Sequence, residues 1–326
     1  MTWKRRRTQK NIKKDRVSEE FTKSFQEVDD FWDQLQNILK IYDSNYNPNL
    51  VDPKLIKKYS SELSILKSKL LSFLDLLYEN KDKAGINWWQ INSCIKDYCL
   101  YVVNGRCKDI ENSIIRLYSI SREYAEEVIK GRWPELEVYM EENCTCPEDL
   151  YNYTISVIDG RWDKFEKIVA SLPTSENLAR IATTYCSRFN CRVEELEKHI
   201  LPYPEYISNY SYNVLDRRWI EAENFLLNDI EIATQYAVNF NFRWPEYERK
   251  IRNKPKRISY YAKTVIKGKL PEELHNKMLM LSLCNDDKNK YYCDEYFEYL
   301  TDCEKDSISY LKSISEEERK TLLSKV

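Results

Sequence analysis

The sequence predicts an all-α protein, an α-solenoid of about seven short helix–turn–helix repeats with helical caps at both ends. Three observations predict this fold class. Glycine is scarce, with five residues in 326, and proline is low at ten, which favours helices over glycine-rich sheets and loops. A short motif recurs at separations of 25 to 31 residues. Within each copy, the apolar residues are spaced by three and four positions, as on one face of a helix.

Seven copies of the motif align on one basic residue. The clearest copy reads YAEEVIKGRWPELE at residues 124–137. The aligned basic residues are Arg106, Arg132, Arg161, Arg192, Arg218, Arg243 and Lys269. The tyrosines that open the copies are Tyr98, Tyr124, Tyr153, Tyr185, Tyr210, Tyr236 and Tyr261. Four of the five glycines come directly before the basic residue and four of the eight tryptophans directly after it, so chance does not explain the pattern.

Each copy is predicted to form two helices. In the first helix, Tyr124 and Val128 are four residues apart and share a face. Gly131 is expected to take the left-handed conformation that ends this helix. Pro134 suits the first turn of the second helix, where its missing N–H would be unpaired anyway.

The second helices carry an apolar stripe that one copy cannot bury alone. The stripes are Trp133, Leu136 and Met140; Trp162, Phe165 and Val169; Val193, Leu196 and Ile200; and Trp244, Tyr247 and Ile251. Helices of about eight to ten residues bury such a face only by stacking on neighbouring copies. The residues assigned to the structural framework of the repeat are Tyr124, Gly131, Arg132, Trp133, Glu137, Tyr153, Gly160, Arg161, Trp162, Glu166, Arg218, Trp219, Glu223, Tyr236, Arg243, Trp244 and Glu248.

The repeated arginine has a glutamate five residues after it in six of the seven copies. We interpret the two as an ion pair that ties a copy to itself or to its neighbour, with the arginine stacked on tryptophan. The alternative is a row of arginines that contacts phosphates. Because glutamate is almost as frequent at its position as arginine, the charges largely cancel, and the structural interpretation is favoured.

The G-R-W-P-E-x-E core with a preceding Y-A-x-x-V-I resembles the short tandem repeats of proteins from tailed bacteriophages and other large DNA viruses. The resemblance covers about residues 98–274. The copies at 98–111 and 185–197 depart from it, because Cys107 and Val193 replace the tryptophan. The resemblance implies a helical-repeat fold and a viral origin, and it implies no reaction.

Four regions are expected along the chain: a basic flexible tail at 1–16, an N-terminal helical hairpin or cap at 17–92, the repeats at 93–280 and a C-terminal helical cap at 281–326. The hairpin comprises a helix from about 18 to 42 and a second helix that starts at Asp52 and Pro53. A dimerising coiled coil is the alternative for this pair. Trp88 and Trp89 are interpreted as core packing at the junction with the repeats, with a binding hot spot as the alternative.

The first fourteen residues contain seven basic residues and no acidic one. They are Lys4, Arg5, Arg6, Arg7, Lys10, Lys13 and Lys14. A block of like charge is usually a solvated tail, and this interpretation is favoured. The alternative is contact with a polyanion such as a nucleic acid.

Residues that would support catalysis, metal binding or a cofactor do not form a recognisable pattern. The chain has two histidines, His199 and His275, and a pairing of His199 with Cys191 lacks an orienting acid. Cys144 and Cys146 are separated by one residue, and a second pair for a zinc site is missing. The ten cysteines are expected to be reduced, and no phosphate-binding glycine loop is present. We therefore expect no enzyme activity, no metal and no cofactor.

No apolar segment in the sequence is long enough to be a signal peptide or a membrane span. The expected location is the cytoplasm, or the host cell cytoplasm if the protein is viral, without membrane contact. The expected function is that of a non-enzymatic protein-binding repeat protein, acting as a scaffold, a decoy or an inhibitor of a host factor. The alternatives are nucleic-acid binding through the basic tail and a structural role in the virion.

Overall fold

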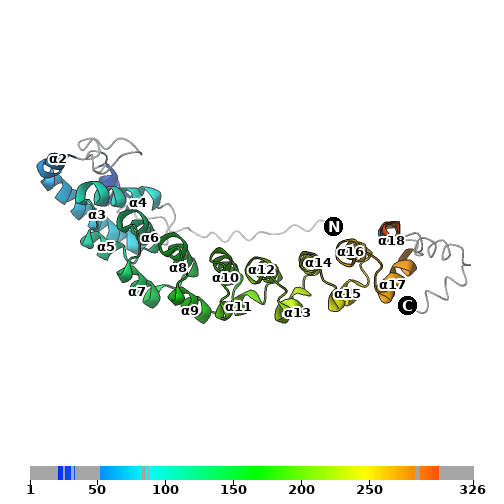
Figure 1. Ribbon diagram of the computed structural model, residues 1–326. Helices are drawn as coiled ribbons and strands as arrows, with labels where there is room; N and C mark the ends of the chain where they lie inside the picture. Colours follow the sequence, from blue (N-terminus) through cyan, green and yellow to red (C-terminus); the bar gives the residue numbers. More distant parts are fainter. Residues whose placement is uncertain are drawn as a thin grey trace, which may run out of the picture. The chain divides into compact units, whose positions relative to one another are not determined.

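The structure is a computed structural model that describes residues 21–24, 26–30, 33, 52–81, 86, 88–282 and 287–300. In these residues all regular structure is helical, which confirms the predicted all-α repeat fold (Figure 1). Contacts divide the chain into two compact units, Met1–Phe165 and Glu166–Val326. The predicted region boundaries at 16, 92 and 280 stay predictions. The basic tail residues 4–14 lie outside the described residues.

The first unit contains a helical segment at its start and three helical pairs of the repeat. Its elements are α2 (Pro53–Lys58), α3 (Ser60–Asn80), α4 (Trp88–Asp97), η2 (Tyr98–Val103), α5 (Lys108–Ile114), α6 (Tyr118–Tyr124), η3 (Ala125–Ile129), α7 (Pro134–Asn143), α8 (Pro147–Tyr153), η4 (Thr154–Ile158) and α9 (Asp163–Ser171), which runs across the division between the units. Helices α4, α6 and α8 are the first helices of successive copies, and α4 contacts α6 as α6 contacts α8.

The start of the first unit packs as a helical pair. Asp52 caps α2 by accepting a hydrogen bond from the Lys54 N–H, and Pro53 is the first helical residue, as the sequence predicts. Tyr59 interrupts the predicted single helix, so α2 ends at Lys58 and α3 begins at Ser60. The buried face of α3 consists of Leu63, Leu66, Leu70, Phe73, Leu74 and Leu77. Phe21, in the described part of the preceding helix, contacts Phe73 with ring centroids 5.2 Å apart.

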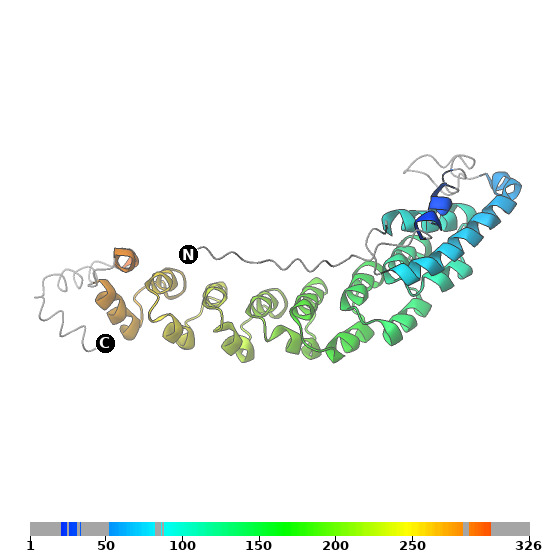
Figure 2. The same cartoon turned by 180° about the vertical axis from the view of Figure 1, so that it is seen from behind.

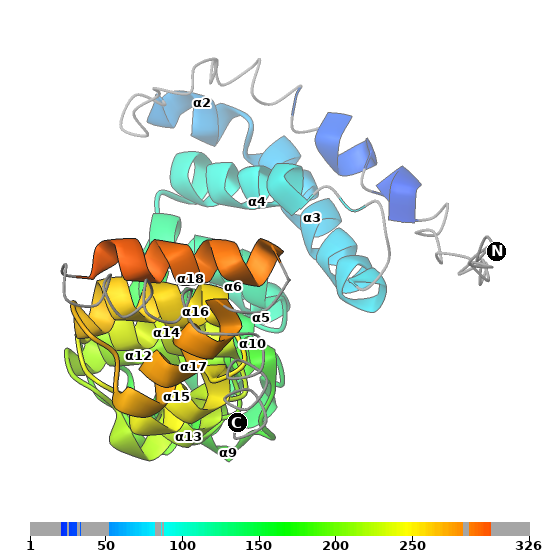
Figure 3. The ribbon, with the colours of Figure 1, turned by 90° about the vertical axis from the view of Figure 1, so that its right-hand side faces the viewer.

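The second unit continues the repeat. Its elements after α9 are α10 (Glu176–Arg188), α11 (Glu194–Ile200), α12 (Pro204–Tyr210), η5 (Ser211–Leu215), η6 (Ile220–Ala222), α13 (Glu223–Leu226), α14 (Ile230–Asn239), α15 (Pro245–Ile251), α16 (Pro255–Tyr261), η7 (Ala262–Ile266), α17 (Glu272–Ser282) and α18 (Asp287–Tyr299). Helices α10, α12, α14 and α16 form one row and α11, α13, α15 and α17 another, from the front and from behind (Figures 1 and 2). Helix α18 packs on α16 and α17 (Figure 3).

The predicted apolar stripes of the second helices are buried. Trp133, Leu136 and Met140 are each at most 1% exposed, and the corresponding residues of the other predicted stripes are at most 4% exposed. Pro134 and Pro245 are the first residues of α7 and α15, as predicted. These helices therefore form the inner packing surface between copies.

The left-handed residue of each copy lies one position earlier than the sequence suggests. The residues with positive φ other than glycine are Asn104, Lys130, Asp159, Asn190, Asp216, Asn241 and Lys267. Each lies two positions before the aligned basic residue, so the prediction for Gly131 is wrong and Lys130 (φ 57°) takes this role. In this copy the Lys130 N–H closes the last turn on the carbonyl group of Ala125, and the chain reverses before the glycine. Asparagine and aspartate fill five of the seven positions, and both tolerate this conformation.

The wide turns are π-helical, and they occur where a copy has one residue more. In five copies the basic residue lies eight positions after the opening tyrosine, and each of these copies has a π segment: η2, η3, η4, η5 and η7. In the copies opened by Tyr185 and Tyr236 the basic residue lies seven positions after the tyrosine, and α10 and α14 stay α-helical. The π turn thus absorbs a one-residue insertion and keeps the tyrosine and the arginine in the same places.

Candidate protein-interaction site

Three side chains and one backbone amide form a cluster that joins consecutive copies. The hydroxyl group of Tyr153, at the end of α8, accepts a hydrogen bond from the Trp133 N–H at 2.9 Å and donates one to Glu137 Oε1 at 3.2 Å. Arg132 donates to both oxygens of the same carboxylate, at 2.8 Å and 2.6 Å. We call this arrangement the junction cluster. Because Tyr153 belongs to the copy that follows, the cluster links two copies through a buried hydrogen-bond network.

The junction cluster recurs along both units. Arginine pairs in the same bidentate way with the glutamate five residues later at Arg106–Glu111, Arg192–Glu197, Arg218–Glu223 and Arg243–Glu248. The tyrosine of the following copy reaches the preceding copy at Tyr124–Glu111, Tyr185–Glu166, Tyr210–Glu197, Tyr236–Trp219 N–H and Tyr261–Glu248. Within the described residues, the Arg–Glu pair therefore lies inside one copy and tyrosine provides the link between copies.

The charges of the junction cluster are compensated internally. Glu137 is 5% exposed, whereas Arg132 lies at the surface with its guanidinium group turned onto the carboxylate. The hydrogen bonds to Glu137 raise the pKa of Arg132 above its usual value, and burial raises the pKa of Tyr153. The carboxylate of Glu137 compensates the charge of Arg132 within the copy, which favours the structural interpretation over a phosphate-reading row.

The aromatic contacts differ from the expected stacking of arginine on tryptophan. Trp133 packs against Tyr124 of its own copy, with ring centroids 5.5 Å apart. The same contact occurs at Tyr153–Trp162, Tyr210–Trp219 and Tyr236–Trp244. The arginine seen over an aromatic ring in this series is Arg218, which lies 3.5 Å from the ring centroid of Phe242. Tryptophan is buried next to the tyrosine, so the arginine cannot reach its face.

An eighth tyrosine closes the series and was missed by sequence reasoning. The hydroxyl group of Tyr296 in α18 accepts a hydrogen bond from the Leu270 N–H at 3.2 Å, as Tyr153 does from Trp133. His275 Nδ1 lies 2.8 Å from the same hydroxyl group and contacts it instead of a glutamate, because the residue five positions after Lys269 is Leu274. Helix α18 is therefore the first helix of a further copy. In the sequence, Tyr296 is the feature that could have indicated this copy, because the glycine, arginine and tryptophan of the motif are missing after it.

The side chains of His199 and Cys144 form hydrogen-bond contacts with other groups of the fold. His199 is fully buried, with Nε2 3.0 Å from the Val169 carbonyl oxygen and Nδ1 3.2 Å from Thr174 Oγ1. The Cys144 thiol donates to the carbonyl group of Cys146 at 3.2 Å. In the part of the chain that the structure describes, no group of three His, Cys, Asp or Glu residues is arranged to hold a metal ion.

The two adjacent tryptophans before the repeats do not both pack in the core. Trp88 is half-buried, whereas Trp89 is 76% exposed. The core interpretation is therefore wrong for Trp89, because the two residues are consecutive in α4 and point about 100° apart around the helix. The other described tryptophans, Trp133, Trp162, Trp219 and Trp244, are at most 4% exposed.

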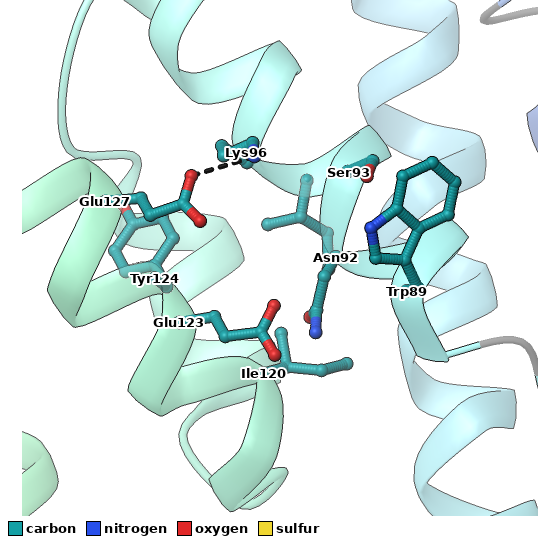
Figure 4. Close-up of a pocket in the computed structure, with 9 residues that line it drawn as sticks. Trp89, Asn92, Ser93, Lys96, Ile120, Glu123, Tyr124 and Glu127 are labelled. Carbon is teal, nitrogen blue, oxygen red and sulfur yellow. Dashed lines mark ion pairs between the residues drawn. The ribbon is translucent and has the colours of Figure 1, made fainter. Parts of the chain in front are cut away.

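Trp89 borders a pocket between α4 and the first helix of the next copy (Figure 4). The pocket has a volume of about 120 Å³. Its lining consists of Trp89, Asn92, Ser93, Ile95 and Lys96 from α4, and Ile120, Glu123, Tyr124 and Glu127 from α6 and η3. All of these residues belong to the first unit. Their elements are tied together by the stacking of copies, so the pocket is preformed by the repeat.

Two carboxylates line this pocket, and they differ in the position of their counter-ions. Glu127 pairs with Lys96 at 2.8 Å, drawn as a dashed line in Figure 4. The closest cation to Glu123 is Arg122, whose guanidinium nitrogen is 3.4 Å away. Burial raises the pKa of Glu123, and the charge of Arg122 counteracts this only in part. Glu123 is thus a partly desolvated carboxylate that pairs with Arg122 outside the pocket lining, and a hydrogen bond with the Asn92 side chain also lowers its pKa.

Asn92 contributes a second polar group beside Glu123. Its side chain is part of the pocket lining, and the residue is 8% exposed. The Asn92 Oδ1 atom is buried and has no hydrogen-bond partner. A buried carbonyl oxygen without a donor costs about 1–3 kcal/mol, so a donor that reaches this end of the pocket would be stabilised.

Comparison with protein-family models, with curated proteins and with solved structures gave no match for this chain. The viral resemblance of the repeat therefore stays a prediction. No described helix is both long and apolar enough to cross a membrane.

Proposed function

We propose that this protein is a non-enzymatic helical-repeat protein that binds another protein, and that the pocket beside Trp89 is part of the contact surface. The observation that carries the proposal is the 76% exposure of Trp89 at the rim of a preformed pocket. Exposing an indole ring to water is unfavourable, and tryptophan is enriched among the residues that dominate binding energy at protein interfaces. A role as scaffold, decoy or inhibitor of a host factor in the cytoplasm completes the proposal.

The construction of the repeat supports a binding role. The junction clusters use buried groups of each copy, so the fold does not depend on the residues that face solvent on the first helices. In such arrays exposed residues can change while the stacked core is kept, which suits a recognition surface. Trp89 and Glu123 lie on two neighbouring first helices, α4 and α6.

The test is affinity purification from cells that produce the protein, followed by mass spectrometry. The bait is compared with its Trp89→Ala variant and with Tyr212→Ala, a control in which another exposed aromatic residue (57% exposed) is removed from the second unit. We expect a set of proteins that is captured by the unchanged chain and by the control but lost with Trp89→Ala. The same proteins with all three baits, or nucleic acid as the main captured material, would overturn the proposal.

A second candidate function is nucleic-acid binding, and one observation favours it. Lys250, Lys254 and Lys256 are exposed around the turn between α15 and α16. The neighbouring Arg252 pairs with Glu273 at 3.2 Å. Together with the basic residues at 4–14, these lysines could contact phosphates. A mobility shift with DNA or RNA that weakens with salt and disappears on deletion of residues 1–14 supports this candidate.

A further inference from the structure

We propose that the pocket between α4 and α6 binds an arginine side chain of the partner protein, with the guanidinium group between the Trp89 ring and the Glu123 carboxylate. The inference rests on the proposed function and adds the chemistry of the partner. It combines three observations at one place: an exposed indole ring, a partly desolvated carboxylate whose counter-ion Arg122 lies outside the pocket lining, and a buried acceptor without a donor. Figure 4 shows Glu123 and Asn92 directed toward the space beside Trp89.

The charges that face the pocket favour a cation. Lys96 neutralises Glu127 through the 2.8 Å ion pair, which leaves Glu123 as the remaining charge of the lining. Arg122 does not belong to the lining, and its closer contact is with Glu126 at 3.1 Å rather than with Glu123 at 3.4 Å. A cation from a partner would therefore meet a carboxylate whose charge is only partly compensated.

The aromatic wall favours arginine over lysine. A guanidinium group is planar, stacks on an aromatic face and can donate two parallel N–H groups to one carboxylate. Cation–π attraction is strongest for tryptophan among the aromatic residues. The compact and strongly hydrated ammonium group of lysine cannot combine a stacked contact with a bidentate one.

Asn92 explains why a side chain with several donors fits best. After two N–H groups have reached Glu123, a guanidinium group has three others, and the Asn92 amide lies beside the carboxylate. Arginine donors can thus contact the carboxylate and the unpartnered Oδ1 atom together.

Two other pockets, both in the second unit, have a different lining. The charged residues of one are Arg192, Arg217, Arg218 and Glu221, and those of the other are Arg243, Arg249, Glu248 and Glu273. In both, arginines of the chain itself line the pocket beside the carboxylates, whereas the lining at Trp89 contains no arginine.

The experiment titrates the full chain with three small probes: N-acetyl-arginine amide, N-acetyl-lysine amide and N-acetyl-citrulline amide. Citrulline is a neutral isostere of arginine, and therefore isolates the role of charge. The readout is the NMR signal of the Trp89 indole N–H, assigned by its absence in Trp89→Phe. We expect saturable shifts with the arginine probe, with Kd on the order of millimolar, weaker binding of the lysine probe and no saturation with citrulline.

The matched variants are Glu123→Gln and Glu142→Gln. Glu142 is an exposed carboxylate on α7 of the same unit and does not line the pocket. We expect Glu123→Gln to weaken arginine binding about tenfold, the effect of losing one charge-assisted hydrogen bond, and Glu142→Gln to leave it unchanged. Circular dichroism of each variant shows that the fold is retained. Trp89→Ala lacks the indole signal, so its binding of the arginine probe is measured by the backbone amide signals of the pocket residues. Its loss of binding is a second, independent test if Glu123→Gln does not fold.

Equal binding of the arginine and citrulline probes, tighter binding of lysine, or an unchanged Kd in Glu123→Gln would overturn the arginine assignment. This failure is distinct from failure of the proposed function. If proteins are captured in a Trp89-dependent way while the arginine probe does not bind, the pocket inference is wrong and protein binding stands. If the arginine probe binds and no protein is captured, the pocket binds arginine and the proposal of protein binding is wrong.

Discussion

The hydroxyl group of Tyr153 donates a hydrogen bond to the carboxylate of Glu137 in the preceding copy, at 3.2 Å. The same hydroxyl group accepts from the Trp133 N–H, which begins a helix whose first turn has no side-chain cap. An N-terminal N–H without a partner is unfavourable when buried. The tyrosine therefore satisfies the start of one copy with a side chain of the next, which explains why the copies after the first open with tyrosine.

Substitution of the two types of tryptophan should separate fold from function. Trp133→Ala removes a fully buried side chain and is expected to lower the free energy of unfolding by about 3–5 kcal/mol. Trp89→Ala removes a side chain that is 76% exposed and is expected to change it by less than about 0.5 kcal/mol. Urea denaturation followed by circular dichroism measures both values. A large loss with Trp89→Ala would mean that Trp89 is part of the core.

Lys130→Gly should stabilise the protein. Lys130 is exposed and has φ 57°, a conformation that costs a residue with a Cβ atom about 1 kcal/mol relative to glycine. We expect the free energy of unfolding to rise by about 0.5 kcal/mol, because the greater entropy of glycine in the unfolded chain offsets part of the gain. The control is Lys198→Gly within α11, which should destabilise by about 1 kcal/mol. Destabilisation by Lys130→Gly would contradict the assignment.

Deletion of one residue should be tolerated in a copy with a π turn and not in a copy without one. Deleting the exposed Ser156 from η4 converts a fourteen-residue motif into the thirteen-residue form that α10 and α14 already use. We expect this variant to fold with a normal helical spectrum. Deleting Gln235 from α14 instead rotates part of that helix by about 100° and displaces Tyr236 from its site. Equal damage from both deletions would show that the π turn does not absorb an insertion.

The protein should lose stability in alkaline solution. Burial raises the pKa of Tyr98 to about 12 and that of Tyr247 to about 12, above the value of about 10 in an unfolded chain. The unfolded state therefore releases these protons first, and the stabilisation that is complete below about pH 10 falls as the pH rises toward 12. The thiols of Cys94 and Cys99, also raised to about 12 by burial, act in the same direction from about pH 9. Urea midpoints across this range measure the effect, and a constant midpoint would contradict it.

Much of the fold could be predicted because the stacking of copies repeats the same residues at the same spacing. The buried stripe of Trp133, Leu136 and Met140 follows from helical periodicity, and a pair such as Arg132 and Glu137 follows from a fixed separation. These features depend on local geometry, which a repeated sequence reveals.

The features that could not be predicted depend on contacts between segments. The role of Tyr296 became visible only through its hydrogen bond to the Leu270 N–H, because its own copy lacks the motif. The left-handed residue is Lys130 rather than Gly131, and the same position is left-handed at Asn190 and Asn241, in the copies without a π turn. The spacing between the opening tyrosine and the basic residue differs by one between copies, and this difference could have indicated the π turns. Asn or Asp two positions before the basic residue could have indicated the left-handed site.

From the sequence, the site at Trp89 could be predicted only as the alternative to core packing. A pair of adjacent tryptophans indicates either packing or binding, and which indole faces solvent depends on the orientation of α4 against its neighbours. The pocket partner Glu123 gave no signal, since it is one of several glutamates in its segment. Its distinction is its partial burial in the pocket lining, with its counter-ion Arg122 outside that lining, and only the arrangement of α4 and α6 creates this.

The most direct test of the account is a double-mutant cycle between Tyr153 and Glu137, because the central claim is that tyrosine links consecutive copies. The free energy of unfolding is measured by urea denaturation for Tyr153→Phe, Glu137→Gln and the double variant. We predict a coupling energy of about 1–2 kcal/mol, as expected for a buried hydrogen bond to a carboxylate. Additive losses within about 0.3 kcal/mol would contradict the claim.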